Sequence, residues 1–182
     1  LFYNKKLFTE AGLDPANPPK TLDEFVAAAQ KIAKHDAAGN LTVAGSTLDM
    51  GGQDHQWWRE VLIRQYGGEP YTDNDQKVAY NSEPGIQALK FYTSLQLEKK
   101  IGQAGFMDEG QAAFRAGKAG MTIDGTFRLG SFRTIKDFEW GVTELPTNDK
   151  NIRSNYASYF ANGISAKTTG EELEASKKFL AY

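Results

Sequence analysis

The sequence predicts an α/β fold, because short apolar strands alternate with amphipathic helical patterns along its 182 residues. Helix start signals recur along the chain, and glycine or proline bounds most of the helical patterns. Strands are expected at residues 1–3, 41–44, 78–80, 121–123, 140–142 and 156–165. Helices are expected from 21 to before 39, over 53–66, from 82 to beyond 95, over 109–116 and from 169 onward.

The helix that follows Thr21 has the clearest start signal. Thr21 and Glu24 have the spacing of a capping box, in which the threonine hydroxyl accepts from a helical N–H and the glutamate reaches back. The helix over 53–66 is expected to stop at Gly67, because glycine readily takes the left-handed conformation that terminates helices. The start of the first helix and the end of the second are therefore both predicted from residues within one turn.

The helix that begins at Ser82 is expected to bury one apolar stripe. Apolar residues recur there at helical spacing, and a proline stands in the first turn, where its missing N–H costs little. The expected stripe consists of Ile86, Leu89, Tyr92 or Phe91, and Leu95.

Composition excludes several classes of function. The apolar fraction of 40%, with 11 Phe, 8 Tyr and 3 Trp, indicates a packed core. The 21 basic and 23 acidic residues leave a net charge of −2, so a nucleic-acid partner or a polybasic membrane patch is not expected. The absence of cysteine removes disulfides, thiolate metal sites and thiol nucleophiles. No apolar run reaches the length that spans a bilayer.

Motifs for catalysis are weak. The two histidines, His35 and His55, are too few for a metal pair, and no nucleophile elbow is present. A phosphate loop at Gly117 is disfavoured, because Ala112 stands where the earlier glycine is required and Ala119 follows the lysine. The sequence therefore predicts no catalytic residue, no metal and no cofactor.

Four strings carry a resemblance to a known family: LFYNKKLF at 1–8, PPKTLDEF at 18–25, FRAGKAGMTIDGTF at 114–127, and GVTELP at 141–146. In this order and spacing they resemble family 1 of the bacterial extracellular solute-binding proteins, the maltose-binding-protein type. The chain departs from the family at Leu22 and Phe127, where tryptophan is usual, and at Gly120, where alanine is usual.

The resemblance implies a periplasmic-binding-protein-like lobe of type II, with an open mixed sheet flanked by helices. Family members have two lobes around a ligand cleft, so residues 1–145 are expected to form the second, C-terminal lobe. Residues 146–182 are expected to be a return segment, a strand and a helix that contribute to the first lobe. The chain is then an internal piece of a longer protein, with the signal peptide outside it.

The implied function is capture of a solute, a carbohydrate in the first place, and its delivery to the permease of an ABC importer. The intact protein is expected to be a periplasmic or otherwise extracytoplasmic monomer that closes by hinge motion. Two alternatives remain open. One is a carbohydrate-active enzyme with Asp54 and Asp124 as its carboxylates. The other is a binding protein for a non-sugar solute such as a polyamine or a metal chelate.

The first group of candidate contacts stands at the start of the helix over 53–66. A sugar site needs aromatic rings for C–H faces and polar side chains for hydroxyls. Gln53, Asp54 and Trp57 supply both kinds. Adjacent helical residues point about 100° apart, so Trp57 and Trp58 are not expected to serve one site. The alternative is that one tryptophan lies in the core and the other covers a hinge.

The second group follows the strand at 121–123. Asp124, Thr126 and Phe127 stand where open α/β sheets place ligands, and Phe127 occupies the position of the family's stacking tryptophan. Alternatively, Asp124 caps a helix and Phe127 belongs to the core. Tyr156 is expected to add a contact from the return strand.

Overall fold

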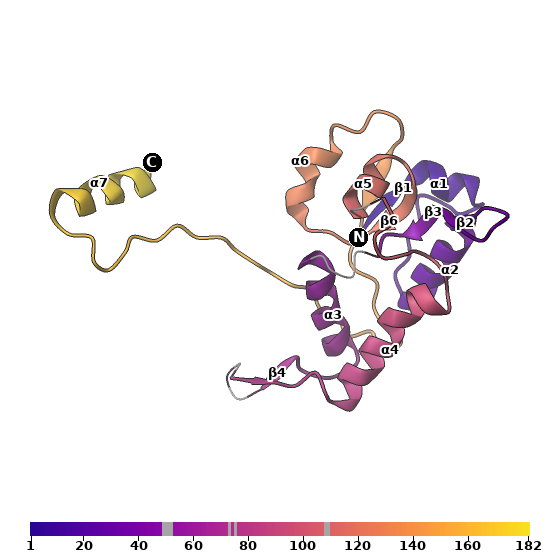
Figure 1. The fold of residues 1–182 in the computed structure, drawn as a ribbon, viewed down its shortest axis with the longest axis horizontal. Helices are drawn as coiled ribbons and strands as arrows, with labels where there is room; N and C mark the ends of the chain where they lie inside the picture. Colours follow the sequence, from indigo (N-terminus) through magenta and orange to yellow (C-terminus); the bar gives the residue numbers. More distant parts are fainter. Residues whose placement is uncertain (49–52, 73, 75, 108–109) are drawn as a thin grey trace.

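The computed structural model describes residues 1–48, 53–72, 74, 76–107 and 110–182. The elements in chain order are β1 (Phe2–Asn4), α1 (Lys5–Glu10), α2 (Leu22–Ile32), β2 (Lys34–His35), β3 (Leu41–Ser46), α3 (Gln53–Gln65), β4 (Tyr71–Thr72), β5 (Lys77–Val78), α4 (Glu83–Leu97), α5 (Gly110–Arg115), β6 (Ala119–Thr122), η1 (Thr126–Arg128), α6 (Leu129–Phe132), β7 (Trp140–Val142) and α7 (Gly170–Ala181). The described residues up to 151 form one packed body, from which the last 31 residues extend as an arm that ends in α7 (Figure 1).

One mixed sheet of five strands organises the packed body, in the order β2-β3-β6-β1-β7. The strands β3 and β6 are parallel, with Ala44 opposite Ala119. β1 is antiparallel to both of its neighbours, β6 and β7. The expected α/β fold with an open mixed sheet is confirmed.

Local signals place the start of α2 and the end of α3 where the sequence predicts them, but α2 ends at Ile32 and is followed by β2, which was not predicted. At the start of α2, the Glu24 backbone N–H donates to the Thr21 hydroxyl at 3.1 Å, and the Thr21 N–H donates to the Glu24 carboxylate at 3.2 Å. At the end of α3, Gly67 has a φ of 87°. The predicted capping box and the predicted glycine stop are both present. The helix predicted over 109–116 begins at Glu109, which lies outside the described residues.

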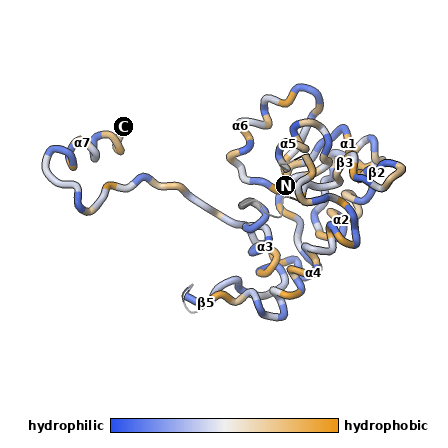
Figure 2. The backbone as a smooth tube through the Cα atoms, in the orientation of Figure 1, coloured by the Kyte–Doolittle hydropathy of each residue, from blue (hydrophilic) through white to orange (hydrophobic). Residues whose placement is uncertain are grey.

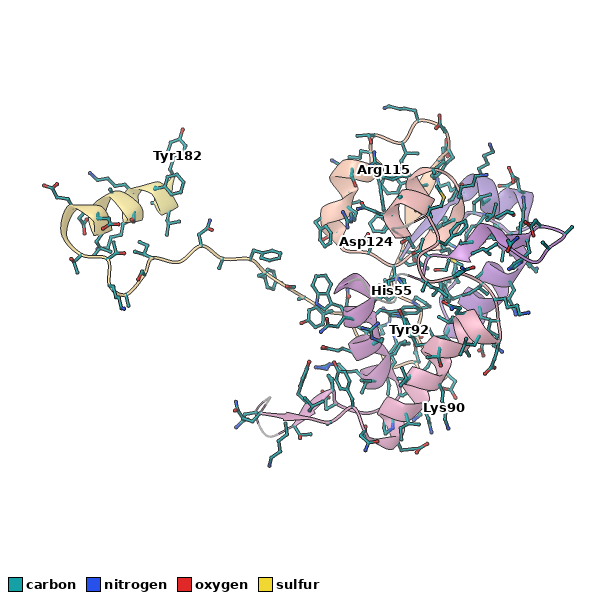
Figure 3. The ribbon with its side chains drawn as sticks, in the orientation of Figure 1. His55, Lys90, Tyr92, Arg115, Asp124 and Tyr182 are labelled. Atoms are coloured by element: carbon teal, nitrogen blue, oxygen red, sulfur yellow. The ribbon has the colours of Figure 1, made fainter. Side chains whose placement is uncertain are left out.

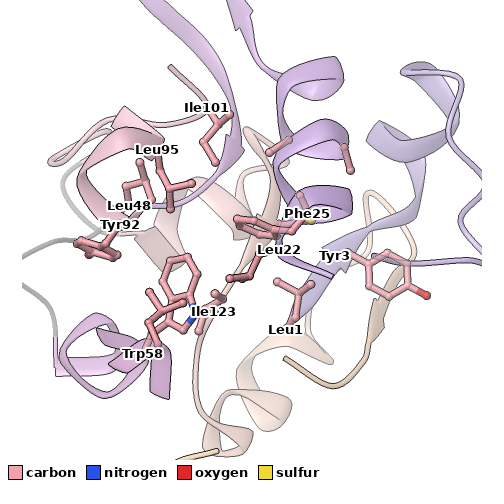
Figure 4. Packing of buried hydrophobic residues seen from close by; sticks show 14 of the residues in the cluster. Leu1, Tyr3, Leu22, Phe25, Leu48, Trp58, Tyr92, Leu95, Ile101 and Ile123 are labelled. Atoms are coloured by element: carbon pink, nitrogen blue, oxygen red, sulfur yellow. The ribbon is translucent and has the colours of Figure 1, made fainter. Parts of the chain in front are cut away.

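The core has two parts, one on each face of the sheet. Phe2 and Tyr3 are consecutive in β1 and therefore point to opposite faces. Tyr3 belongs to a large cluster with residues of α1, α2, α3 and α4, whereas Phe2 packs with Phe114 of α5 and Phe132 of α6. The large cluster includes Trp58 of α3 (Figure 4). Among the described residues, no helix combines the length and the apolar character needed to cross a membrane.

The predicted stripe of α4 is only half right. Tyr92 and Leu95 are buried, but Ile86 and Leu89 are exposed, the latter to 55%. The buried face instead begins with the small residues Gly85 and Ala88. A side chain at Gly85 would overlap the backbone carbonyl of Tyr80, at 2.1 Å. Close backbone approach, which the hydrophobic pattern does not reveal, therefore turns the larger apolar residues outward.

The predicted strand over 156–165 is not formed. A strand requires a neighbouring strand for its ladder hydrogen bonds, and this segment has none in the structure. It runs extended beyond the packed body, with Phe160 exposed to 95% (Figure 1). Figure 2 shows apolar positions along this arm and in α7. The final helix is present as expected, but its N-cap residue, Thr169, makes no side-chain capping hydrogen bond.

Backbone and amide hydrogen bonds hold the chain to the packed body up to residue 151, and Arg153 and Tyr156 still contact Glu144 and Trp57. The backbone of Thr147 exchanges hydrogen bonds with Lys20 and Leu22, at 3.0 and 2.8 Å. The Gln65 side chain donates to the carbonyl of Pro146 at 3.0 Å, and the side chain of Asn148 donates to the carbonyl of Gln65. The six residues from 146 to 151 are thus bound to the same body as the first 145.

Candidate functional site

Three chain segments leave the sheet at one edge. β3 and β6 run parallel, and β7 runs in the same direction, because β1 is antiparallel to both β6 and β7. The segments that follow these strands therefore all begin at the carboxyl edge of the sheet. They lead to α3, to the turn of residues 124–128, and to the return segment that contains Tyr156. Ligands of open α/β sheets bind outside such carboxyl edges.

Side-chain and backbone contacts hold this edge together. The hydroxyls of Thr47 and Thr122, at the ends of β3 and β6, lie 2.7 Å apart. After β7, the N–H of Thr143 donates to the carbonyl of Leu1 at 2.9 Å. Beyond β6, Ile123 joins the core cluster that contains Trp58 of α3, and the two lie near each other in Figure 4. The turn after β6 thus starts beside the first half of α3.

Two of the predicted site residues meet at the start of α3. The rings of Trp57 and Tyr156 are stacked, with centroids 5.3 Å apart and planes inclined by 12°. Trp57 is half-buried and Tyr156 is exposed, so the pair lies at the surface of the packed body. The neighbouring Trp58 is 1% exposed and belongs to the core. The two tryptophans therefore have different roles, as the angle between adjacent helical residues predicts.

A second group of predicted residues lies in the turn after β6. The Asp124 carboxylate accepts from the Gly125 N–H at 2.7 Å and from Nε of Arg128 at 2.9 Å. The Asp124 side chain is 5% exposed and the Arg128 side chain 28% exposed. This ion pair closes the turn, because it joins positions i and i+4.

Phe127 extends from the same turn and is 61% exposed, so it is not a core residue. Its ring packs over the backbone of Gly125, where an added Cβ would lie 2.0 Å from the ring. The Arg128 guanidinium carbon lies 5.1 Å from the ring centroid, within the range of a cation–π contact. Thr126 is exposed beside it. The turn therefore presents an aromatic ring, a hydroxyl and a guanidinium together.

Sequence reasoning missed Arg128, although the spacing of four residues from Asp124 was a usable signal. Gln53 and Asp54 begin α3, but their side chains lie outside the described part of the chain. Within the described residues, no group of three or more His, Asp or Glu side chains could hold a metal ion. The described side chains of this edge are therefore aromatic rings, hydroxyls and ion-paired groups.

A buried aromatic cluster supports the start of α3. Nδ1 of His55 lies 2.9 Å from the hydroxyl of Tyr92 on α4, and the Trp58 ring meets both side chains edge-on (Figure 3 labels His55 and Tyr92). Burial and the nearby Arg59 charge lower the pKa of His55 to about 4. His55 is therefore neutral at pH 7, and it joins the helix that carries Trp57 to the core.

The described residues thus form an α/β body with a mixed sheet and aromatic rings at the carboxyl edge. The model of the bacterial extracellular solute-binding proteins matches residues 1–182, so the chain belongs to that family. The resemblance inferred from the sequence motifs is confirmed, and with it the type II periplasmic-binding-protein fold.

Known relatives and structures agree with this family. The periplasmic sn-glycerol-3-phosphate-binding protein UgpB of Yersinia pseudotuberculosis is 26% identical over 153 residues, which are 80% of this chain and 33% of that protein. The cyclic α-maltosyl-1,6-maltose binding protein of Arthrobacter globiformis is 30% identical, with a TM-score of 0.66 over 81% of this chain and 36% of that one. Maltose-bound MalE3 of T. maritima is 24% identical, with a TM-score of 0.77 over 98% of this chain and 46% of that one. The chain thus spans about a third of the curated relative's length.

Proposed function

We propose that the chain is the larger part of one lobe of an extracytoplasmic solute-binding protein that captures a carbohydrate for an ABC importer. The observation that carries this proposal is the stacked pair of Trp57 and Tyr156 at the carboxyl edge of the sheet. Flat aromatic faces match the C–H faces of sugars, and burial of those faces supplies much of the binding free energy. Family membership and the sugar-binding structural relatives support the same ligand class.

Each predicted contact has a role in this proposal. Trp57 and Tyr156 stack against the apolar faces of the sugar, and Phe127 offers a further aromatic surface. Thr126 supplies a hydroxyl that both donates and accepts. Gln53 and Asp54 supply polar groups from the first turn of α3.

The arm has a structural role in this proposal. The second lobe comprises residues 1–145 together with the adjoining 146–151, which are hydrogen bonded to it. The remaining return segment packs against the first lobe, because Tyr159, Phe160 and Phe179 are otherwise left in water. Closure of the two lobes around the ligand then presents the intact monomer to the permease. The protein releases its solute unchanged and is not an enzyme.

The first experiment is a titration of the intact protein that carries this chain. Isothermal calorimetry with maltose, maltotriose, D-tagatose and sn-glycerol 3-phosphate identifies the ligand class, and chromatography of the recovered sugar tests for cleavage. Trp57→Ala should weaken sugar binding roughly tenfold, because it removes a stacking ring. Tyr156→Ala should have a similar effect, because it removes the other ring of the stacked pair.

The outcomes separate the alternatives. Sugar recovered intact, with weaker binding in Trp57→Ala, supports the proposal. A cleaved sugar favours the enzyme alternative. Failure of all three sugars to bind contradicts the carbohydrate assignment, and binding of sn-glycerol 3-phosphate alone moves the ligand class to small phosphate esters.

A further inference from the structure

We propose that Arg128 is a specificity-determining residue that donates hydrogen bonds to hydroxyls of an uncharged solute. The buried Asp124 carboxylate compensates the charge of Arg128, so that the site does not prefer anionic solutes. This inference rests on the proposed function, because it concerns the ligand of the same sheet edge. Arg128 was not among the predicted contacts. In this inference Asp124 is a positioning residue, which acts on the ligand through Arg128.

Two contacts fix the position of the guanidinium, and a third orients the carboxylate that it binds. Nε donates to the Asp124 carboxylate at 2.9 Å, and the Phe127 ring lies beneath the guanidinium carbon at 5.1 Å. The Gly125 N–H holds the other oxygen of Asp124 at 2.7 Å, so the carboxylate is itself oriented. A donor held in this way loses little conformational entropy when it binds a ligand.

The ion pair with Asp124 uses only one of the three guanidinium nitrogens of Arg128. Only Nε donates to Asp124, and within the described residues the two terminal nitrogens, Nη1 and Nη2, have no acceptor. The side chain is 28% exposed, and it lies beside the exposed ring of Phe127 and the exposed Thr126. This arrangement suits a sugar. The planar N–H donors can bind two neighbouring hydroxyls, and the aromatic ring can pack against the C–H groups beside them.

The charge of this arginine is compensated locally. The carboxylate lies within hydrogen-bond distance and is almost inaccessible to water, so its field is poorly screened. An incoming phosphate would meet a nearly neutral pair, whereas a hydroxyl would still find two polarised donors.

The test uses the intact protein that carries this chain and four named probes. Calorimetric affinities are measured for maltose, maltotriose, D-tagatose and sn-glycerol 3-phosphate. Arg128→Gln should weaken the best-bound sugar roughly 10- to 100-fold, because it removes hydrogen bonds from a charged donor. Asp124→Asn should raise the affinity for sn-glycerol 3-phosphate relative to that sugar by roughly tenfold or more, because the arginine charge is then uncompensated.

Two further variants keep the test interpretable. Arg133→Gln is the matched control, since Arg133 is an exposed arginine that follows α6, and it should change every affinity less than twofold. Arg128→Lys keeps a cation beside Asp124 but offers no planar donor pair, and it should still weaken sugar binding at least fivefold. Thermal unfolding of each variant establishes that it is folded at the temperature of the titration.

Each result has a definite meaning. If Trp57→Ala weakens sugar binding while Arg128→Gln and Arg128→Lys leave it within twofold, the inference fails and the proposed function stands. The inference also fails if the unmodified protein prefers sn-glycerol 3-phosphate and Arg128→Gln loses that preference. The arginine would then act as an uncompensated cation. If the unmodified protein binds none of the four probes, both the proposed function and the inference fail.

Discussion

The stability of the packed body should depend on the charge state of one buried histidine. His55 is 2% exposed, and burial with the nearby Arg59 lowers its pKa from the ordinary 6.5 to about 4. The unfolded chain therefore binds a proton below pH 6.5 that the folded protein does not bind until about pH 4. Stability is unaffected above the unfolded pKa and falls as the pH drops from about 6.5 towards 4.

The size of this loss follows from the two pKa values. One pKa unit corresponds to about 1.36 kcal/mol, so a difference of about 2.5 units amounts to about 3.4 kcal/mol once the folded histidine also titrates. At pH 5, where the folded form remains mostly neutral, the loss is about 2 kcal/mol relative to pH 7.5. This is a large share of the 5–15 kcal/mol that is typical of a folded domain.

The assay is urea unfolding at pH 7.5 and at pH 5. Carboxylates also titrate in this range, so the informative quantity is the difference between the unmodified protein and His55→Asn, which has no titrating ring but can still meet the Tyr92 hydroxyl. The unmodified protein should lose about 2 kcal/mol more than this variant. His35→Asn, at the exposed histidine of β2, should keep the pH dependence of the unmodified protein. Equal losses in the protein and in His55→Asn would refute the reasoning.

Further substitutions test the packing and the helix cap by urea unfolding. Gly45→Ala should destabilise the protein by about 3 kcal/mol or more, because the added Cβ would lie 1.9 Å from the carbonyl oxygen of Ala29. Gly130→Ala, within α6 and with no neighbour within 4 Å, should change stability by less than about 1 kcal/mol, and similar effects of the two would contradict the close approach of β3 and α2. Thr21→Ala should cost about 1 kcal/mol, since the Glu24 N–H loses its acceptor, and an unchanged unfolding midpoint would show that the capping box is not stabilising.

The parts of the fold that the sequence predicted correctly depend on neighbours in the chain. The capping box at Thr21 and the helix stop at Gly67 need only residues within one turn, so their signals are complete in the sequence. Four of the five strands of the sheet were found as short apolar runs, but β2 (Lys34–His35) was not, because its residues are polar and exposed. The order and direction of the strands were not found either, because pairing between distant strands leaves no local signal.

The errors arise where a distant surface decides the outcome. Ile86 and Leu89 satisfy the helical pattern as well as the buried residues do, but the small Gly85 and Ala88 let the other face of α4 approach its neighbours. The segment over 156–165 has strand-like residues, yet it has no strand beside it in the structure.

The candidate site shows the same division. The sequence by itself determined the family, the α/β class and the identity of the aromatic and polar residues, because these follow from motifs and local patterns. Only the tertiary structure decided that Trp58 is buried while Trp57 stacks on Tyr156, since the two residues of that pair are 99 positions apart in the chain. It also decided that the Asp124 carboxylate is engaged by Arg128 and shielded from water. Which atoms remain available to a ligand depends on how segments distant in sequence pack together, and that packing is a property of the folded chain.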